Sequence, residues 1–156
     1  MNRLFSQFQP EHYDIQWDLR QAKDERLIRG TAIISGRHLT PEPICLHAKD
    51  LQIERAAVNG KNIKVSTDGD VLTLDSRDDG LVRISIEFLL SLTDAMHGIY
   101  PCYYEYQGEK RELYATQFES HHAREAFPCI DEPEAKATFA ISILSDEPTV
   151  LSNMPV

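Results

Sequence analysis

Histidines are the side chains of this sequence best suited to chemistry, because a neutral imidazole binds transition metals and a titrating one moves protons. The chain has six, but no His-Glu-x-x-His motif, the spacing that places two histidines around a zinc ion on one helix face. His121 and His122 are adjacent. The other four are isolated in the sequence: His12, His38, His47 and His97. Because a complete zinc site needs three or four converging ligands, we expect solvated or hydrogen-bonded histidines and no metal site within this chain.

Cysteines and paired carboxylates are the next candidates for catalysis. The three cysteines are widely spaced and form no Cys-x-x-Cys pair: Cys45, Cys102 and Cys129. This spacing favours reduced, mostly buried thiols over a catalytic nucleophile. The pair Asp78-Asp79 is expected in a hairpin turn, and the pair Asp131-Glu132 precedes Pro133 in an expected fixed loop, so acid–base catalysis by either has little support. Glycine-rich phosphate loops and the Gly-x-Ser-x-Gly elbow are absent, which argues against nucleotide binding and serine hydrolysis.

One segment, residues 114–139, gathers many of the remaining functional residue types. It reads YATQFESHHAREAFPCIDEPEAKATF and closely resembles the signature of the M1 family of zinc aminopeptidases. That signature has a T-Q-x-E step, then A-R-x-A-F-P-C-x-D-E-P, then K-A-T-F. Three further runs resemble family elements in the family's order: ICLHAKDLQI at 44–53, HGIY at 97–100 and LSNMP at 151–155. The resemblance covers nearly the whole chain, but only the N-terminal β domain of the family.

The resemblance implies a role in holding a substrate. In the family, zinc is bound by H-E-x-x-H and a downstream glutamate, and a G-A-M-E-N loop helps to hold the substrate; neither motif occurs in this sequence. The resemblance implies that Glu119 binds the free α-amino group of a peptide and that Gln117 lines the pocket for the first side chain. We therefore expect zinc in the full-length enzyme, with no catalytic residue and no zinc bound in this chain.

The residues that follow Glu119 are expected to form a structural loop. An arginine can pair with a carboxylate through parallel hydrogen bonds, and each proline fixes the path of the chain. We assign this scaffolding role to five residues: Arg124, Pro128, Asp131, Glu132 and Pro133. The tyrosines between Tyr100 and Tyr106 are expected to form a half-buried strand face.

The elements that must position these residues are β-strands. Apolar residues fall on alternate positions, the period of a half-buried strand, in four stretches: 13–19, 44–53, 82–88 and 137–143. Three pairs suit the positive φ angles of tight hairpins: Asn59-Gly60, Asp68-Gly69 and Asp79-Gly80. The only helix-like stretch is the turn at 120–127, which ends at Pro128. These patterns predict an all-β fold, an antiparallel sandwich, and the resemblance implies the saddle-like N-terminal domain of the M1 type.

We expect one β domain over residues 1–156. A length of 156 residues, 42% of them hydrophobic and 26% charged, is typical of one soluble globular domain. The family's domain generally continues past the S-N-M-P element, so we expect it to be cut short at Val156 and the catalytic zinc domain to be absent. A sheet cut short exposes a strand edge, which predicts self-association through that edge.

Charge and hydrophobicity limit the classes of partner that this chain can bind. The net charge of −9 would repel a phosphate backbone, so we expect no nucleic acid. No run approaches the ~18 consecutive apolar residues of a membrane helix, and the N-terminus lacks the pattern of a secretory signal. We expect a cytoplasmic protein without membrane contact, whose partners are a peptide N-terminus and the missing catalytic domain of the same polypeptide.

The principal hypothesis is a substrate-anchoring N-terminal domain of a zinc aminopeptidase that releases N-terminal amino acids from peptides, inactive as this fragment. One alternative is a non-catalytic protein-interaction or scaffold module related to the same domain, against which the intact Gln117 and Glu119 argue. A further alternative is a family branch that also acts on a lipid epoxide, which Phe118, Glu119 and the D-E-P form fit less well.

Overall fold

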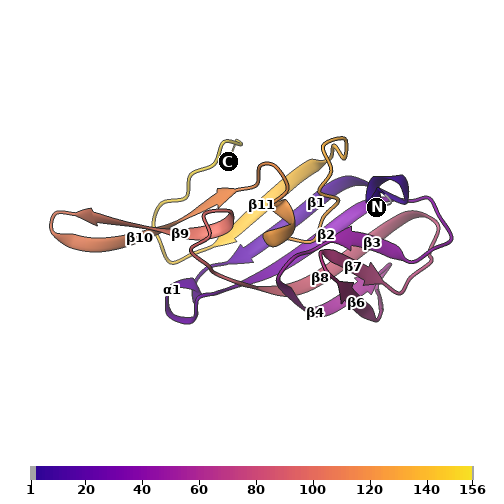
Figure 1. The fold of residues 1–156 in the computed structure, drawn as a ribbon, viewed down its shortest axis with the longest axis horizontal. Helices are drawn as coiled ribbons and strands as arrows, with labels where there is room; N and C mark the ends of the chain where they lie inside the picture. The colour runs from indigo at the N-terminus through magenta and orange to yellow at the C-terminus, as the bar shows by residue number, and fades with distance from the viewer. Residues whose placement is uncertain (1–2, 156) are drawn as a thin grey trace.

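The computed structural model describes residues 3–155, and the strands of this part of the chain form three sheets (Figure 1). The largest sheet has the order β11-β1-β2-β8-β4-β5. Its strands are β1 (Phe8–Asp18), β2 (Leu27–His38), β4 (Leu51–Val58), β5 (Lys61–Asn62), β8 (Gly80–Ser91) and β11 (Thr138–Leu144). A smaller sheet has the order β3-β7-β6, with β3 (Ile44–His47), β6 (Val65–Asp68) and β7 (Val71–Leu74). The third is a hairpin of β9 (Gly98–Tyr106) and β10 (Glu109–Gln117).

The core lies between the large sheet and the β3-β7-β6 sheet. Strand β8 shows why: Val82, Ile84, Ile86 and Phe88 are buried and alternate with side chains that face the other way. This is the alternation expected of a strand with one face on a core. Buried residues of β1, β2 and β8 form one cluster with those of β3 and β7. The prediction of an all-β sandwich is confirmed.

One strand pair departs from the predicted antiparallel arrangement. Strand β11 runs parallel to β1, with Tyr13 opposite Phe139, and the two rings stack with centroids 4.9 Å apart. A parallel neighbour needs a long connection, and here the whole chain from β2 to β10 supplies it. Alternation in the sequence predicts a strand but not its direction, so this pairing could not be read from residues 137–143.

Two of the expected tight turns join paired strands, and one does not. Asn59-Gly60, with φ angles of 49° and 78°, connects β4 to β5, and Gly69 lies in the turn between β6 and β7. The predicted hairpin at Asp79-Gly80 is wrong, because β7 and β8 belong to different sheets and Gly80 begins β8 after the crossing. A hairpin turn that was not predicted occurs at Gln107-Gly108, where both φ angles are positive.

Three short helical turns complete the described fold: η1 (Leu4–Ser6), α1 (Ala22–Glu25) and η2 (Ala123–Glu125). Only η2 falls in the predicted helix-like stretch, so the expectation of a single such stretch is wrong. Turns of three or four residues are too short to show a helical period in the sequence. Among the residues that the structure describes, no helix is long and apolar enough to cross a membrane.

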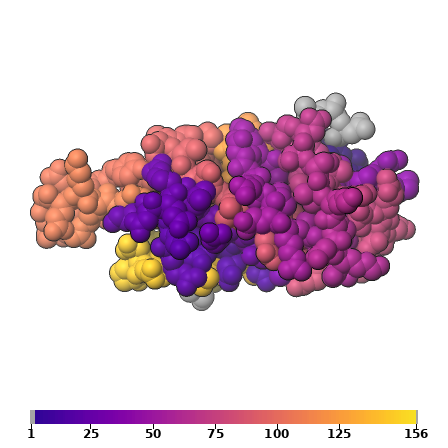
Figure 2. All heavy atoms as spheres, turned by 90° about the horizontal axis from the view of Figure 1, so that it is seen from below, coloured from indigo at the N-terminus to yellow at the C-terminus, as the bar shows by residue number. Residues whose placement is uncertain are grey.

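The hairpin of β9 and β10 extends from one end of the molecule (Figure 2, orange). Tyr103, Tyr104 and Tyr106 on it are 59%, 44% and 53% exposed, so the expected half-buried tyrosine face is wrong for these three. One of the two edges of the large sheet is formed by β11, whose residues are all exposed. Self-association through this edge stays a prediction. Val156, where we expected the domain to be cut short, lies outside the described residues.

Candidate functional site

The two predicted substrate-binding residues lie at the end of strand β10. Gln117 is the last residue of this strand and pairs with Gly98 at the start of β9. Phe118 is half-buried and its ring meets that of Phe127 edge to face, with centroids 5.9 Å apart. Gln117 and Glu119 on either side of it are exposed. The Phe118 ring therefore fixes the end of the hairpin against the core, while its two neighbours remain accessible to a ligand.

Gln117 and Glu119 are also joined by a hydrogen bond. The backbone N–H of Glu119 donates to Oε1 of Gln117 over 3.2 Å, and the peptide bond between Glu119 and Ser120 is cis. None of the ion pairs found among residues 3–155 involves Glu119. Its carboxylate is thus free to accept hydrogen bonds from a cationic group that approaches from outside.

Arg124 is held by one carboxylate in the loop that follows and by another in the turn between β6 and β7. Its Nε donates to Oδ2 of Asp131 over 3.0 Å, and its Nη2 donates to the Asp131 backbone carbonyl over 3.3 Å. A third guanidinium nitrogen lies 3.3 Å from Oδ2 of Asp70, which is in the turn between β6 and β7. The Arg124 and Asp131 side chains are only 14% and 11% exposed. Their ion pair therefore joins the η2 segment to the loop after it in a site with little access to water.

Strand β3 holds the same loop through backbone contacts. Cys129 and His47 exchange two hydrogen bonds of 2.7 Å and 2.9 Å, and Pro128 just before them is buried. The backbone N–H of Asp131 donates to Nδ1 of His47 over 3.1 Å, so this nitrogen must be unprotonated. Burial, together with the nearby Arg124 guanidinium, lowers the pKa of His47 and favours that neutral form. Burial also raises the pKa of the Cys129 thiol, which makes it a packed residue rather than a nucleophile.

Strand β1 and the start of the chain hold the loop from the other side. The backbone N–H of Ile130 donates to the buried hydroxyl of Tyr13 over 3.1 Å, and burial raises the pKa of this tyrosine. Trp17 donates from its indole nitrogen to the carbonyl of Ala126 over 3.1 Å. Oε1 of Glu132 accepts from the backbone N–H groups of Leu4 and Phe5. Pro133, which follows, is exposed.

The structure thus divides the predicted site residues into two groups. Gln117 and Glu119 project from the end of the hairpin, and the loop residues, except the exposed Pro133, lie in a packed, hydrogen-bonded segment beside it. Phe127 connects the groups, because its ring contacts Phe118 on one side and Tyr13 on another. The position of Glu119 is therefore set by the core through a short chain of aromatic contacts.

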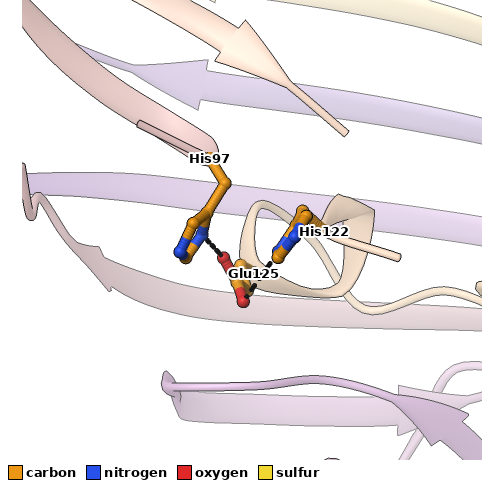
Figure 3. A group of neighbouring side chains, drawn as sticks. All are labelled: His97, His122 and Glu125. Atoms are coloured by element: carbon orange, nitrogen blue, oxygen red, sulfur yellow. Dashed lines mark hydrogen bonds and ion pairs between the residues drawn. The ribbon is translucent and has the colours of Figure 1, made fainter. Parts of the chain in front are cut away.

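A third group was not predicted, and one of its members, His122, follows Glu119 by three residues. His97, His122 and Glu125 converge although His97 is far from the other two in sequence (Figure 3). Nδ1 of His122 is 3.1 Å from Oε1 of Glu125, and Nδ1 of His97 is hydrogen-bonded to Oε2. Lys49 reaches Oε1 of the same carboxylate over 2.9 Å. The His-x-x-Glu spacing at 122–125 was a visible signal, but nothing in the sequence marked His97 as its neighbour.

Comparisons with known proteins show the family of this chain. The family described as the peptidase M1 N-terminal domain matches residues 9–156. The chain is 41% identical over 160 residues to aminopeptidase N of Lactobacillus delbrueckii subsp. lactis, covering 99% of this chain and 19% of that protein. It is 42% identical to aminopeptidase N of Lactococcus lactis subsp. lactis, covering 98% and 18%, and 32% identical to aminopeptidase M1-C of Oryza sativa subsp. japonica, covering 94% and 18%.

The chain thus spans about a fifth of the length of these relatives. The matched region begins one residue after the start of β1 and includes all the other strands of the large sheet. It also includes the hairpin and the packed loop. A match of this extent exceeds what a shared short motif would give. The chain therefore belongs to the peptidase M1 N-terminal domain family.

Proposed function

We propose that this chain is the substrate-anchoring N-terminal domain of a zinc aminopeptidase that releases N-terminal amino acids from peptides, and that the 156-residue chain alone does not cleave them. The observation that carries the proposal is the exposed carboxylate of Glu119, which forms no ion pair with residues 3–155 and lies at the end of a hairpin whose base is packed on the core. The names of the relatives, which are aminopeptidases, support the same activity.

Glu119 would recognise the α-ammonium group of the peptide. A carboxylate about 4 Å from an ammonium gains on the order of 4 kcal/mol of Coulomb energy at an effective dielectric constant near 20, before desolvation is subtracted. Hydrogen bonds to charged groups contribute a net ~1.5–3 kcal/mol. A peptide with a blocked N-terminus would lose this contribution. Because the amine would be held at one distance from the reacting bond, only the first peptide bond would be placed for cleavage.

Gln117 would line the pocket for the first side chain. The hydrogen bond that its Oε1 accepts from the backbone of Glu119 leaves its NH₂ group available to a substrate. The zinc ion would be held by the H-E-x-x-H motif and downstream glutamate of a catalytic domain outside this sequence. When bound there, zinc would polarise the scissile carbonyl and activate a water molecule. We further propose a cytosolic location, which three free cysteines fit.

The test is a kinetic comparison in the polypeptide that contains this chain together with its catalytic domain. Glu119→Gln keeps the size of the side chain and removes its charge, and should lower kcat/KM for a free-amine peptide about 10- to 150-fold. Glu109→Gln is the matched control, because Glu109 is exposed on the same hairpin, away from Glu119, and pairs with the exposed Arg111. Unchanged kcat/KM in Glu119→Gln would overturn the anchor. Peptide release by the 156-residue chain with added zinc would overturn its proposed inactivity.

A further inference from the structure

Three metal-ligating side chains meet at the base of the hairpin. His97 immediately precedes β9, and His122 and Glu125 flank and end the η2 turn. One ligand atom from each lies within 4.8 Å of the other two, and Figure 3 shows both imidazoles pointing at the same carboxylate. The two rings are stacked, with centroids 4.2 Å apart and an angle of 22° between their planes. Two separate segments of the chain therefore present their donors to one point.

The donor set suits zinc. Two imidazole nitrogens and one carboxylate oxygen are a set that binds Zn²⁺ with a fourth position open to water. With bonds of about 2.0–2.1 Å and tetrahedral angles, the donor atoms must lie roughly 3.3 Å apart. Nδ1 of His122 and Oε1 of Glu125 are already 3.1 Å apart. Small side-chain rotations would therefore bring the three donors to the spacing that the ion requires.

In the structure, hydrogen bonds already join the three groups that would bind the metal. Each imidazole can reach the Glu125 carboxylate from Nδ1 only as a donor, so each of these nitrogens carries a hydrogen. Zinc would take the place of those hydrogens, which would pass to Nε2 of a neutral ring or to the solvent, and would hold the same three groups. The Glu125 side chain is only 11% exposed, and the Lys49 ammonium group also contacts its carboxylate.

The surroundings leave space for the fourth ligand. A small cavity of about 60 Å³ adjoins the cluster and is lined by His97, Glu125 and Asp50, among others. This is enough for a water molecule. Asp50 adds a negative charge on the cavity wall, which favours a cation. Lys49 has the opposite effect, because its ammonium group lies 2.9 Å from Oε1 of Glu125 and competes with a metal for that oxygen.

We propose that His97, His122 and Glu125 bind one zinc-class divalent cation and so tie the start of β9 to the η2 turn. Gln117 pairs with Gly98, the residue after His97, and Glu119 lies three residues before His122. A metal bound here would hold both ends of the short segment that carries Glu119. The cluster is formed entirely by this chain, so the 156-residue protein is sufficient to test it.

The experiment is a titration of the 156-residue chain, free of any histidine tag, with Zn²⁺ in a calorimeter and with Co²⁺ followed by visible absorption. We expect one ion per chain, tetrahedral Co²⁺ bands, and a rise in Tm with Zn²⁺ as binding stabilises the folded state. His97→Ala and His122→Ala should each weaken binding at least about tenfold. His121→Ala is the matched control, an adjacent exposed histidine whose loss should leave the affinity unchanged.

Lys49→Gln provides a test in the opposite direction. Removing the competing ammonium should tighten Zn²⁺ binding several-fold, an effect that adventitious binding elsewhere on the surface would not show. Far-UV circular dichroism checks that each variant is folded, and if His122→Ala is not, His97→Ala and Lys49→Gln decide the question. The proposal is overturned if no ion binds, if both cluster variants bind as tightly as the original chain, if His121→Ala loses binding, or if Lys49→Gln leaves the affinity unchanged or weaker.

Discussion

Replacing Arg124 with methionine should destabilise the domain strongly, because it would strand a nearly buried carboxylate. Methionine keeps much of the apolar stem, so the loss is mainly that of the guanidinium group. Asp131 would lose the 3.0 Å bond from Nε and keep only a 3.3 Å contact with the backbone N–H of residue 124. Breaking a buried ion pair from one side costs about 3–5 kcal/mol. With side chains that are 14% and 11% exposed, we expect a loss at the lower end, about 3 kcal/mol.

The assay is urea unfolding followed by the fluorescence of Trp17, which is 3% exposed and packs beside Phe127. Arg20→Met is the matched control, since Arg20 pairs with Asp18 over 2.6 Å on the surface, where the arginine is 54% exposed. Exposed ion pairs contribute little, so this variant should unfold almost as the original chain does. If Arg124→Met loses no more stability than Arg20→Met, the loop is not held by its ion pair and the scaffolding role is refuted.

Three further outcomes follow from burial. Burial lowers the pKa of His47, so this side chain binds a proton more tightly in the unfolded chain than in the folded one. The free energy of unfolding should therefore fall as the pH drops below about 6.5. Urea titrations at several pH values should show a smaller fall for His47→Gln. Iodoacetamide should modify the half-buried Cys102 in the folded chain and reach the buried Cys129 only after unfolding, as mass spectrometry can check. Gly30→Ala would place a methyl group 2.2 Å from the ring of Phe88, so thermal unfolding should show a loss of about 3 kcal/mol or more.

Much of the fold could be predicted from the sequence, because a strand that buries one face and exposes the other has apolar residues at alternate positions. Val82 to Phe88 alternate cleanly, and the structure places the apolar members in the core. The sheet to which a strand belongs and the direction in which it runs were harder to predict, because both depend on contacts between distant segments. The parallel pairing of β11 with β1 and the crossing of the chain at Asp79-Gly80 are both of this kind. Local turn chemistry at Asp79-Gly80 was compatible with a hairpin, but the tertiary arrangement did not use it.

The residues of the candidate site also differ in how far the sequence could predict them. Gln117 and Glu119 could be singled out only by resemblance, since an exposed glutamine and glutamate have no distinguishing local pattern. That Arg124 would meet a carboxylate followed from its chemistry, but its second partner, Asp70, comes from a turn far away in the sequence. The convergence of His97 on Glu125 was missed for the same physical reason, because it is made by folding the hairpin base against the η2 turn.

Recognition of a free α-amino group by Glu119 is tested most directly by a double-mutant cycle with two competitive inhibitors that differ only in that amine. Their dissociation constants are measured in the polypeptide that contains this chain and its catalytic domain, with Glu119 intact and as Glu119→Gln. The intact protein should prefer the amine-bearing inhibitor by about 10- to 150-fold, and Glu119→Gln should lose that preference while its affinity for the amine-free inhibitor stays the same. An equal preference in both proteins would contradict the proposed anchor.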